Sequence, residues 1–181
     1  MKALPAVVAA FFLLLPLLHR AGLRFNPTPS LPKGIYRIAP GAPERGDLVA
    51  FCLESPVWTS LARERGYLGS GSCPSGLRPL LKRLAGLPGD AVTVTPDGIQ
   101  ITSATGSVSA WSAPARREDS MGRPLPASSL RAGVIPAGMA LVLAGHPGSF
   151  DSRFFGFVPL AGMTRVEPVC TFTFEPSTMG N

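Results

Sequence analysis

The 181-residue chain has few of the residues from which metal and cofactor sites are built. It contains two histidines and three cysteines, and none of them stand at zinc-ligand spacing. It lacks a Gly-x-Ser-x-Gly elbow, a phosphate-binding glycine loop and an HExxH motif. The net charge is +6, but the basic residues are scattered and form no helix or stripe suited to nucleic acid. We therefore expect no cofactor, no metal and no nucleic-acid partner, and we relate the positive charge to nearby lipid headgroups.

Proline and glycine are plentiful, with 20 of each, and hydrophobic residues make up 45% of the chain. The hydrophobic content argues against disorder. The many prolines and glycines argue for short strands joined by turns and against a helix bundle. The length suits one membrane segment followed by one domain of ordinary size.

An uncharged run of sixteen residues, Ala3–Leu18, lies close to the N-terminus. Its length falls between a signal-peptide core of about 7–15 residues and a spanning helix of about 17–25. Arg20 can extend its charge to the headgroups, which lengthens the apolar stretch. No convincing small-x-small cleavage site follows, so we favour an uncleaved membrane anchor over residues 1–24, with a removed signal peptide as the alternative. Residues 25–181 are then the folded domain.

Apolar and alternating runs bounded by turn residues predict a mostly-β domain with one small helix. The helix is expected to begin after Ser55, with Pro56 in its first turn, and to stop at Gly66. The polar segment Gly106–Pro126 is expected to be a long surface excursion. The predicted strands are Gly34–Ile38, Asp47–Leu53, Leu80–Leu84, the two arms of a hairpin around Pro96-Asp97-Gly98, Gly138–Gly145 and the last strands within Met163–Phe174.

The three cysteines divide into a pair and a single residue. Cys52 and Cys73 bracket the predicted helix, so a disulfide between them is reasonable if the domain is exported. Three reduced thiols remain the alternative. Cys170 is then expected to be a buried apolar side chain and not a nucleophile.

Histidine offers no convincing general base, because His19 lies at the edge of the apolar run and His146 in a turn. Lys82 offers one instead. In the predicted strand it shares a face with Leu80 and Leu84, and burial among leucines lowers the pKa of an ammonium and favours the neutral amine. A neutral lysine can take a proton from a serine hydroxyl. The alternative is an edge-strand lysine that reaches water.

Ser30 is the candidate nucleophile, because prolines at 29 and 32 fix the backbone around it. The Ser30 N–H and the Thr28 hydroxyl can form a two-donor oxyanion hole. Taken alone, the stretch Asn26–Arg37 favours a proline-rich linker with incidental hydroxyls.

Four sequence blocks, in order, resemble the type I signal peptidase family of serine–lysine endopeptidases (S26). They are "TPSLPKGIY" (Thr28–Tyr36), "RGDLVAF" (Arg45–Phe51), "KRLAGLPGD" (Lys82–Asp90) and "VIPAGMALVLAGHPGSFDSRFFGFVP" (Val134–Pro159). The opening box, Asn-x-Thr-x-Ser-x-Pro-x-Gly-x-Tyr, has Leu31 where methionine is usual. It and the cysteine-bounded helix before the lysine box are similar to the conjugative-transfer branch, the TraF group, which matures pilin subunits.

The resemblance implies a role for each matched residue. Ser30 is expected to be the nucleophile and Lys82 the general base, with Thr28 and the Ser30 N–H in the oxyanion hole. Further residues are implied to support the lysine: Ser149 as its hydrogen-bond partner, and Asp151 with Arg153 as an acid–base pair in which Asp151 also matters for activity. The last box opens on "GHPG" in place of the family's Gly-Asp-Asn-Arg, so the loop before Ser149 must run differently.

The resemblance also implies the fold, the function and the location. The expected fold is mostly β, with coiled antiparallel sheets of the signal-peptidase type, a helical insertion at 52–73 and one N-terminal transmembrane helix. The expected function is cleavage of exported precursors on the periplasmic face of the bacterial inner membrane, with a conjugative pilin as the leading substrate and cyclisation as an alternative to hydrolysis. Expected partners are the precursor, the lipid bilayer and other conjugative transfer proteins.

Two other functions share part of this sequence pattern. A LexA-like self-cleaving repressor shares the serine–lysine chemistry, but it would need a DNA-binding helical domain in place of Ala3–Leu18. The other is a non-catalytic, membrane-anchored assembly protein of the transfer apparatus that retains the fold.

Overall fold

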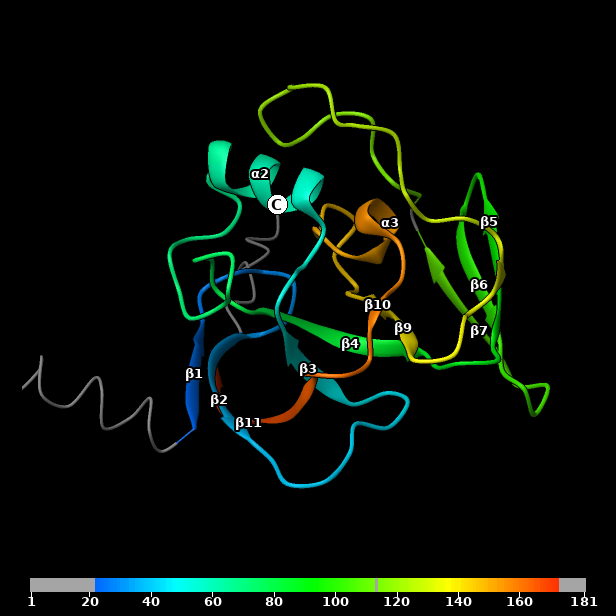
Figure 1. Ribbon diagram of the computed structural model, residues 1–181, viewed down its shortest axis with the longest axis horizontal. Coiled ribbons are helices and arrows are strands. Elements are labelled where there is room, and N and C mark those ends of the chain that lie inside the picture. Colours follow the sequence, from blue (N-terminus) through cyan, green and yellow to red (C-terminus); the bar gives the residue numbers. More distant parts are fainter. Residues whose placement is uncertain (1–21, 113, 173–181) are drawn as a thin grey trace, which may run out of the picture.

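The computed structural model describes residues 22–112 and 114–172, which form two antiparallel sheets and two short helices (Figure 1). The larger sheet has seven strands in the order β1-β2-β11-β3-β4-β9-β10. Their bounds are Leu23–Asn26 (β1), Lys33–Ile38 (β2), Leu48–Phe51 (β3), Leu80–Gly86 (β4), Met139–Leu143 (β9), Val158–Pro159 (β10) and Thr164–Phe172 (β11). The expected mostly-β architecture of curled antiparallel sheets is confirmed.

The predicted N-terminal anchor, residues 1–24, lies outside the described residues apart from its last three. Within the part of the chain that is described, no helix has both the length and the apolar character needed to cross a membrane.

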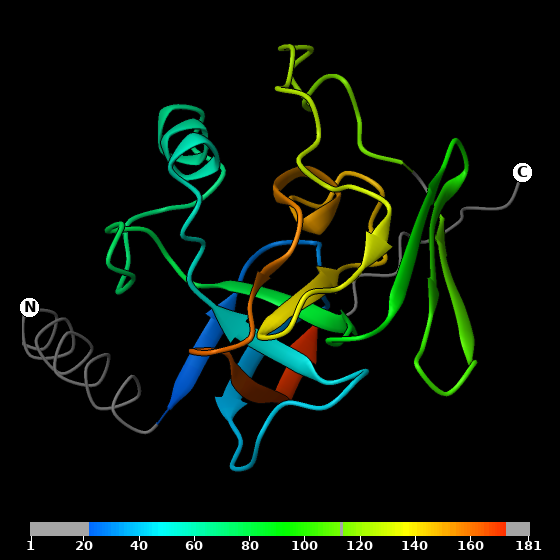
Figure 2. The ribbon, with the colours of Figure 1, turned by 45° about the vertical axis from the view of Figure 1, so that its right-hand side comes forward.

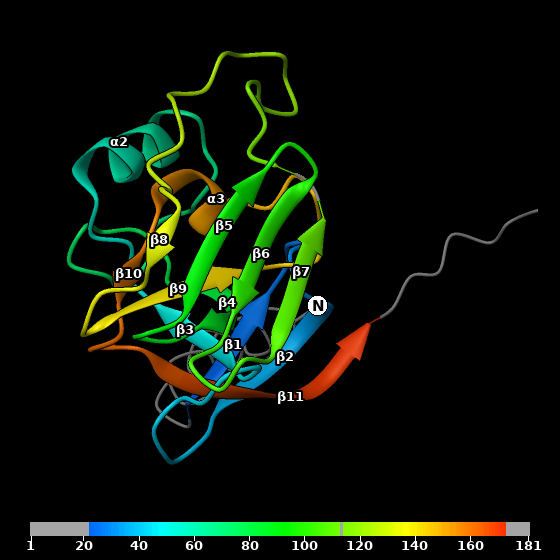
Figure 3. The same ribbon diagram turned by 90° about the vertical axis from the view of Figure 1, so that its right-hand side faces the viewer.

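The smaller sheet has four strands in the order β7-β6-β5-β8 and stands to one side of the larger one (Figures 2 and 3). The predicted hairpin forms its centre, with Thr95 opposite Gly98 at the turn. The bounds are Ala91–Thr95 (β5), Gly98–Thr102 (β6), Val108–Ser112 (β7) and Gly133–Val134 (β8).

One sequence-based expectation was incomplete and another was wrong. The segment Gly106–Pro126 lies at the surface as expected, but it also contains β7, which adds to the hairpin and places Trp111 opposite Ile99. Pairing with an available strand outweighed the polar composition. Cys170 was expected to be buried and is exposed. Strand β11 pairs with β3 only over Thr164–Val166, so its later residues run beyond the core.

Strand β4 occupies the middle of the larger sheet and carries the lysine box. It pairs with β3, placing Val49 opposite Lys82, and with β9, placing Leu143 opposite Arg83. Leu80, Lys82 and Leu84 are buried whereas Arg83 is exposed, so the predicted face is correct. Lys82 therefore projects from the buried face of an inner strand.

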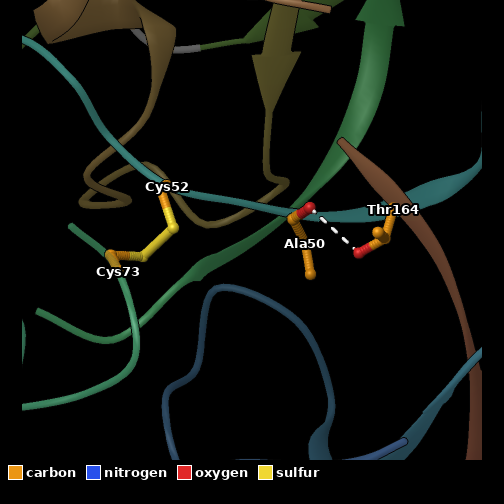
Figure 4. The surroundings of a disulfide bond; sticks show 4 residues. All are labelled: Ala50, Cys52, Cys73 and Thr164. Carbon is orange, nitrogen blue, oxygen red and sulfur yellow. Dashed lines mark hydrogen bonds between the residues drawn. A yellow bond between two sulfur atoms is a disulfide. The ribbon is translucent and has the colours of Figure 1, made fainter. Parts of the chain in front are cut away.

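The cysteine-bounded insertion contains helix α2, Pro56–Glu64, close to where the sequence predicts it. Its first turn uses the Ser55 carbonyl, which accepts a hydrogen bond from the Thr59 N–H, and the Ser55 hydroxyl makes no cap. A disulfide joins Cys52, just after β3, to Cys73 at the far end of the insertion (Figure 4). The insertion is therefore tied to the sheet at its base.

An ion pair connects two of the sequence blocks. The Arg45 guanidinium contacts both carboxylate oxygens of Asp90, at 2.5 and 2.8 Å. Asp90 is buried and also accepts the Leu87 N–H at 2.7 Å. This pair links the turn before β3 to the turn that follows β4, and so fixes one end of the antiparallel strand pair that holds Lys82.

Candidate active site

The loop between β1 and β2, which carries Ser30, is held by a buried amide. The Asn26 side-chain N–H donates to the carbonyls of Thr28, Leu31 and Pro32, each at 3.2 Å. The Tyr36 hydroxyl donates to the Pro32 carbonyl at 2.6 Å. A proline-rich loop has few N–H groups of its own with which to bond, and these two side chains provide the missing contacts.

Packing fixes the same loop from the next residue. The Leu31 side chain is buried in a cluster with Tyr36, Ala50 and Val166. Close approach of β2 and β11 also requires a glycine at 34, because a Cβ there would lie 2.1 Å from the Cys170 carbonyl oxygen. The loop is thereby held against the sheet on one side while Ser30 is left half-exposed on the other.

Ser30 and Lys82 line one cavity of about 260 Å³, together with Thr28. Ser30 and Lys82 lie about 50 residues apart in the sequence. The curled sheet brings the β1–β2 loop, which carries Ser30, close to β4, which carries Lys82. Lys82 is only 3% exposed, whereas Ser30 remains accessible to a substrate. The two predicted reactive residues therefore share one space.

The pKa of Lys82 is lowered from its ordinary 10.5 to about 8. Burial is the largest cause, because it penalises the ammonium form. The Asp151 charge raises the pKa of Lys82 and the Arg153 charge lowers it, and both are smaller influences. Near pH 8 a large fraction of Lys82 is a free amine that can accept a proton.

Asp151 and Arg153 form a buried ion pair at 2.9 Å, and both side chains are almost fully enclosed. Asp151 also caps the short helix α3, Ser152–Phe155, by accepting the Arg153 N–H at 3.1 Å. Ala144, just after β9, donates its N–H to Asp151 at 3.0 Å and accepts from Arg153 at 2.9 Å. The burial of Asp151 raises its pKa, against the opposing influence of Arg153. The pair fastens the loop before α3 to the end of β9.

The buried Ser149 lies at the nucleophile. Its hydroxyl donates to the Ser30 Oγ at 3.3 Å. A contact with Lys82 was expected from the resemblance, and the hydrogen bond that the structure describes goes to Ser30 instead. The shorter "GHPG" loop folds as a tight turn in which the Ser149 N–H donates to the His146 carbonyl at 3.0 Å.

Thr28 is placed beside the nucleophile, but its hydroxyl is engaged. It donates to the Asn26 side-chain oxygen at 2.7 Å, and the Thr28 N–H donates to the same oxygen at 3.2 Å. A contribution to an oxyanion hole would require this hydroxyl to rotate away from Asn26.

Four side chains at the site were given no role from the sequence. Asn26 and Tyr36 form the frame of the nucleophile loop, and both stand in the opening box as its first and last letters. Tyr67 and Phe150 line the cavity of Ser30 and Lys82. The position of Phe150 between the two candidate residues Ser149 and Asp151 could have indicated that it lies at the site. No local sequence pattern indicates this for Tyr67, which belongs to the cysteine-bounded insertion.

The arrangement suits nucleophilic acyl transfer. A half-exposed serine shares a cavity with a buried lysine whose pKa is lowered. The side chains of Asn26 and Tyr36 hold the serine loop, and the charges of the Asp151–Arg153 ion pair act on the lysine. Among the described residues, no group of three or more acidic, cysteine or histidine side chains is placed to bind a metal ion.

Comparisons with known proteins agree with this chemistry. The model of the signal peptidase family, peptidase S26, matches residues 1–167. The conjugal transfer protein TraF of Agrobacterium fabrum (strain C58) is 37% identical, covering 86% of this chain and 85% of that protein. The plasmid transfer protein TraF of Escherichia coli is 33% identical, with 85% of each chain covered. A solved signal peptidase I from Enterococcus faecalis V583 is 27% identical over 74% of this chain, with a TM-score of 0.37 that is too low to inform the fold.

Proposed function

Because this chain belongs to the peptidase S26 family of signal peptidases, we propose that it is a serine endopeptidase that cuts exported precursor polypeptides through Ser30 and Lys82. The observation that carries the proposal is the shared cavity of the two residues, in which burial lowers the pKa of Lys82 to about 8. An amine with that pKa is a suitable general base near neutral pH.

In the proposed mechanism, the Ser30 Oγ attacks the scissile carbonyl as its proton passes to the Lys82 amine. The developing oxyanion accepts hydrogen bonds from the Ser30 N–H and from the Thr28 hydroxyl after that hydroxyl leaves Asn26. Lys82 then protonates the leaving amine, which breaks the peptide bond and leaves an acyl-enzyme. Water then gives a proton to Lys82 as its oxygen attacks the acyl carbon. Lys82 returns that proton to the Ser30 Oγ as the ester bond breaks, which releases the acyl group as a carboxylic acid.

The supporting residues act through position. Ser149 orients the Ser30 hydroxyl through their hydrogen bond. The negative charge of Asp151 raises the pKa of Lys82 and so stabilises the ammonium that forms on Lys82 during attack, while Arg153, its ion-pair partner, opposes this effect. This assigns Asp151 a direct influence on rate without contact with the substrate.

The substrate we propose is a conjugative pilin precursor, because the curated relatives are named as conjugal or plasmid transfer proteins. The proposed location is the periplasmic face of the bacterial inner membrane, with residues 1–24 as the anchor and 25–181 as the peptidase domain. The Cys52–Cys73 disulfide is consistent with an oxidising compartment.

The test is mass spectrometry of a pilin precursor co-expressed with the full chain. Wild type and the Ser109→Ala control, an exposed serine of β7, are expected to yield the shortened pilin, and Ser30→Ala only the precursor. A product lighter than the linear fragment by one water marks release to the pilin's own amino group. Equal maturation with Ser30→Ala would contradict the peptidase proposal and favour the non-catalytic assembly protein.

A further inference from the structure

Ser30 lines two cavities besides the one that contains Lys82, with volumes of about 650 and 390 Å³. The smaller of these two is called the second cavity. Ser30, Tyr67 and Phe150 line both the second cavity and the cavity that contains Lys82. The Tyr67 and Phe150 rings meet edge to face with their centres 5.5 Å apart. These two rings therefore form a partition, and Ser30 stands where the two spaces join.

The lining of the second cavity combines apolar side chains with a few charged ones, of which Asp119 is nearly buried and paired with two arginines. Leu125 and Phe154 join the partition rings in forming the apolar part. Arg116 and Glu118 lie at the rim and are exposed. Such a lining favours an apolar side chain and leaves the rim charges in water.

The wall of this cavity is rigidly built around Asp119, on the loop that follows β7. Its carboxylate accepts hydrogen bonds from the Tyr67 hydroxyl at 2.6 Å, from Arg123 Nε at 2.7 Å and from Arg65 at 3.3 Å. It also accepts the N–H groups of Met121 and Arg123, at 2.9 and 3.0 Å. The loop is thus latched to the cysteine-bounded insertion, and we call these contacts the Asp119 latch.

We propose that the second cavity is a substrate subsite that takes a bulky apolar side chain of the polypeptide whose carbonyl lies at Ser30. The inference rests on the proposed peptidase function. The occupant is the substrate itself, because Ser30 lines both cavities and a polypeptide whose carbonyl lies at Ser30 is next to each of them. Neighbouring side chains of an extended chain point to opposite sides, so adjacent substrate residues enter different cavities across the Tyr67–Phe150 partition.

Leu125 gives a clean test, because it lines the second cavity and is absent from the lining of the first. Leu125→Trp fills the subsite from the loop side without touching Ser30 or Lys82. Met121→Trp is the matched control, since Met121 lies on the same loop and is 74% exposed. The assay uses the full chain in detergent with a random library of twelve-residue synthetic peptides, whose products are identified by mass spectrometry.

Wild type and Met121→Trp are expected to favour a large apolar residue at one fixed position next to the cleaved bond. Leu125→Trp should lower kcat/KM for peptides with that residue about tenfold or more beyond any change for peptides with alanine there. Tyr67→Ala should widen the accepted residues at two adjacent positions, because it removes the partition. Circular dichroism establishes that each variant is folded.

The outcomes separate the two claims. If wild type shows no cleavage that depends on Ser30, both the peptidase function and the subsite are wrong. If wild type cleaves in a Ser30-dependent way, but folded Leu125→Trp and Tyr67→Ala keep its preferences at every position, the peptidase stands and the subsite is overturned.

Discussion

Burial of Lys82 has opposite consequences for reactivity and for stability. Burial makes a free amine available near neutral pH. It also lowers the free energy of unfolding, because the folded protein binds a proton at Lys82 less tightly than the unfolded chain does. Lys82 is enclosed by strands on both sides of β4 and by the pair Asp151–Arg153. Its surroundings therefore set both the pH at which it reacts and the stability that is lost to hold it there.

The pH dependence of cleavage reports on this residue. We expect kcat/KM to rise with pH through about 8, because only the unprotonated Lys82 accepts the serine proton. Asp151→Asn removes the charge that raises the pKa of Lys82, so the rise should move to lower pH even as the maximal rate falls. The measurement is a pH–rate profile on folded protein, and a rise that stays in place would contradict this electrostatic role.

Lys82→Met should inactivate the protein and stabilise it. Because the folded pKa of about 8 lies below the ordinary 10.5, the unfolded chain binds more protons between these values, and stability rises with pH across that window. The penalty is present in full below about pH 8, on the order of 3 kcal/mol at 1.4 kcal/mol per pKa unit. Methionine removes it.

Urea unfolding at pH 7 and at pH 11 measures this difference. Lys82→Met should be more stable than wild type at pH 7, with the gain reduced or absent at pH 11. Lys33→Met, which replaces an exposed lysine, serves as the control and should change little. A loss of stability at pH 7 in Lys82→Met would mean that the lysine is held by contacts stronger than its burial penalty.

Among the elements, the insertion between β3 and β4 depends on its disulfide. The bond closes a loop with a sequence separation of 21 and holds the segment that carries Tyr67. Replacing Cys52 and Cys73 together by alanine should cost about 3 kcal/mol through the freedom gained by the unfolded chain. That corresponds to a fall in Tm of roughly 10 °C.

Thermal unfolding of the double variant against Cys170→Ala tests this contribution. Cys170 is an exposed free cysteine, so its replacement controls for the loss of a sulfur atom alone and should leave Tm nearly unchanged. Equal Tm values for the two proteins would show that the insertion is held by its packing and not by the bond.

The loop after β7 depends on the Asp119 latch in the same way that the insertion depends on its disulfide. Asp119→Ala removes an acceptor of five hydrogen bonds. Trypsin should then cut the loop, at Arg116 or Arg117, about tenfold faster or more, because each lost bond to a charged group is worth ~1.5–3 kcal/mol. Glu118→Ala, at the exposed neighbouring position, should leave the rate unchanged. A similar rate for both variants would mean that the latch does not order the loop.

At the scale of the whole molecule, local sequence patterns predicted the buried face of Lys82 and most of the strands, but not β1, β7, β8 or β10. Leu80, Lys82 and Leu84 alternate with exposed Arg83, which is a pattern that any half-buried strand shows. The proline-rich loop, the cysteine-bounded helix and the hairpin could also be predicted from the sequence. Proline, glycine and β-branched residues influence the conformation of the backbone close to them, so their effect can be predicted locally.

The features that sequence reasoning missed depend on partners far along the chain. Strand β7 forms because it pairs with β6. Cys170 is exposed because β11 continues past the last residue that pairs with β3. The Tyr67–Asp119 contact spans 52 residues and the Ser149–Ser30 contact spans 119. No local pattern fixes such contacts, because they follow from how the sheets curl and bring distant loops together.

The central claim is that Ser30 becomes acylated with Lys82 as its base, and intact-mass analysis of the enzyme tests it directly. The full chain is mixed at pH 7 with a peptide ester whose acyl portion ends at the cleavage site, stopped with acid, and the adduct is mapped by fragmentation. We predict one acyl group on Ser30 in wild type and none in Lys82→Met. An adduct on another residue, or an equal adduct on Ser30 in Lys82→Met, would contradict the account.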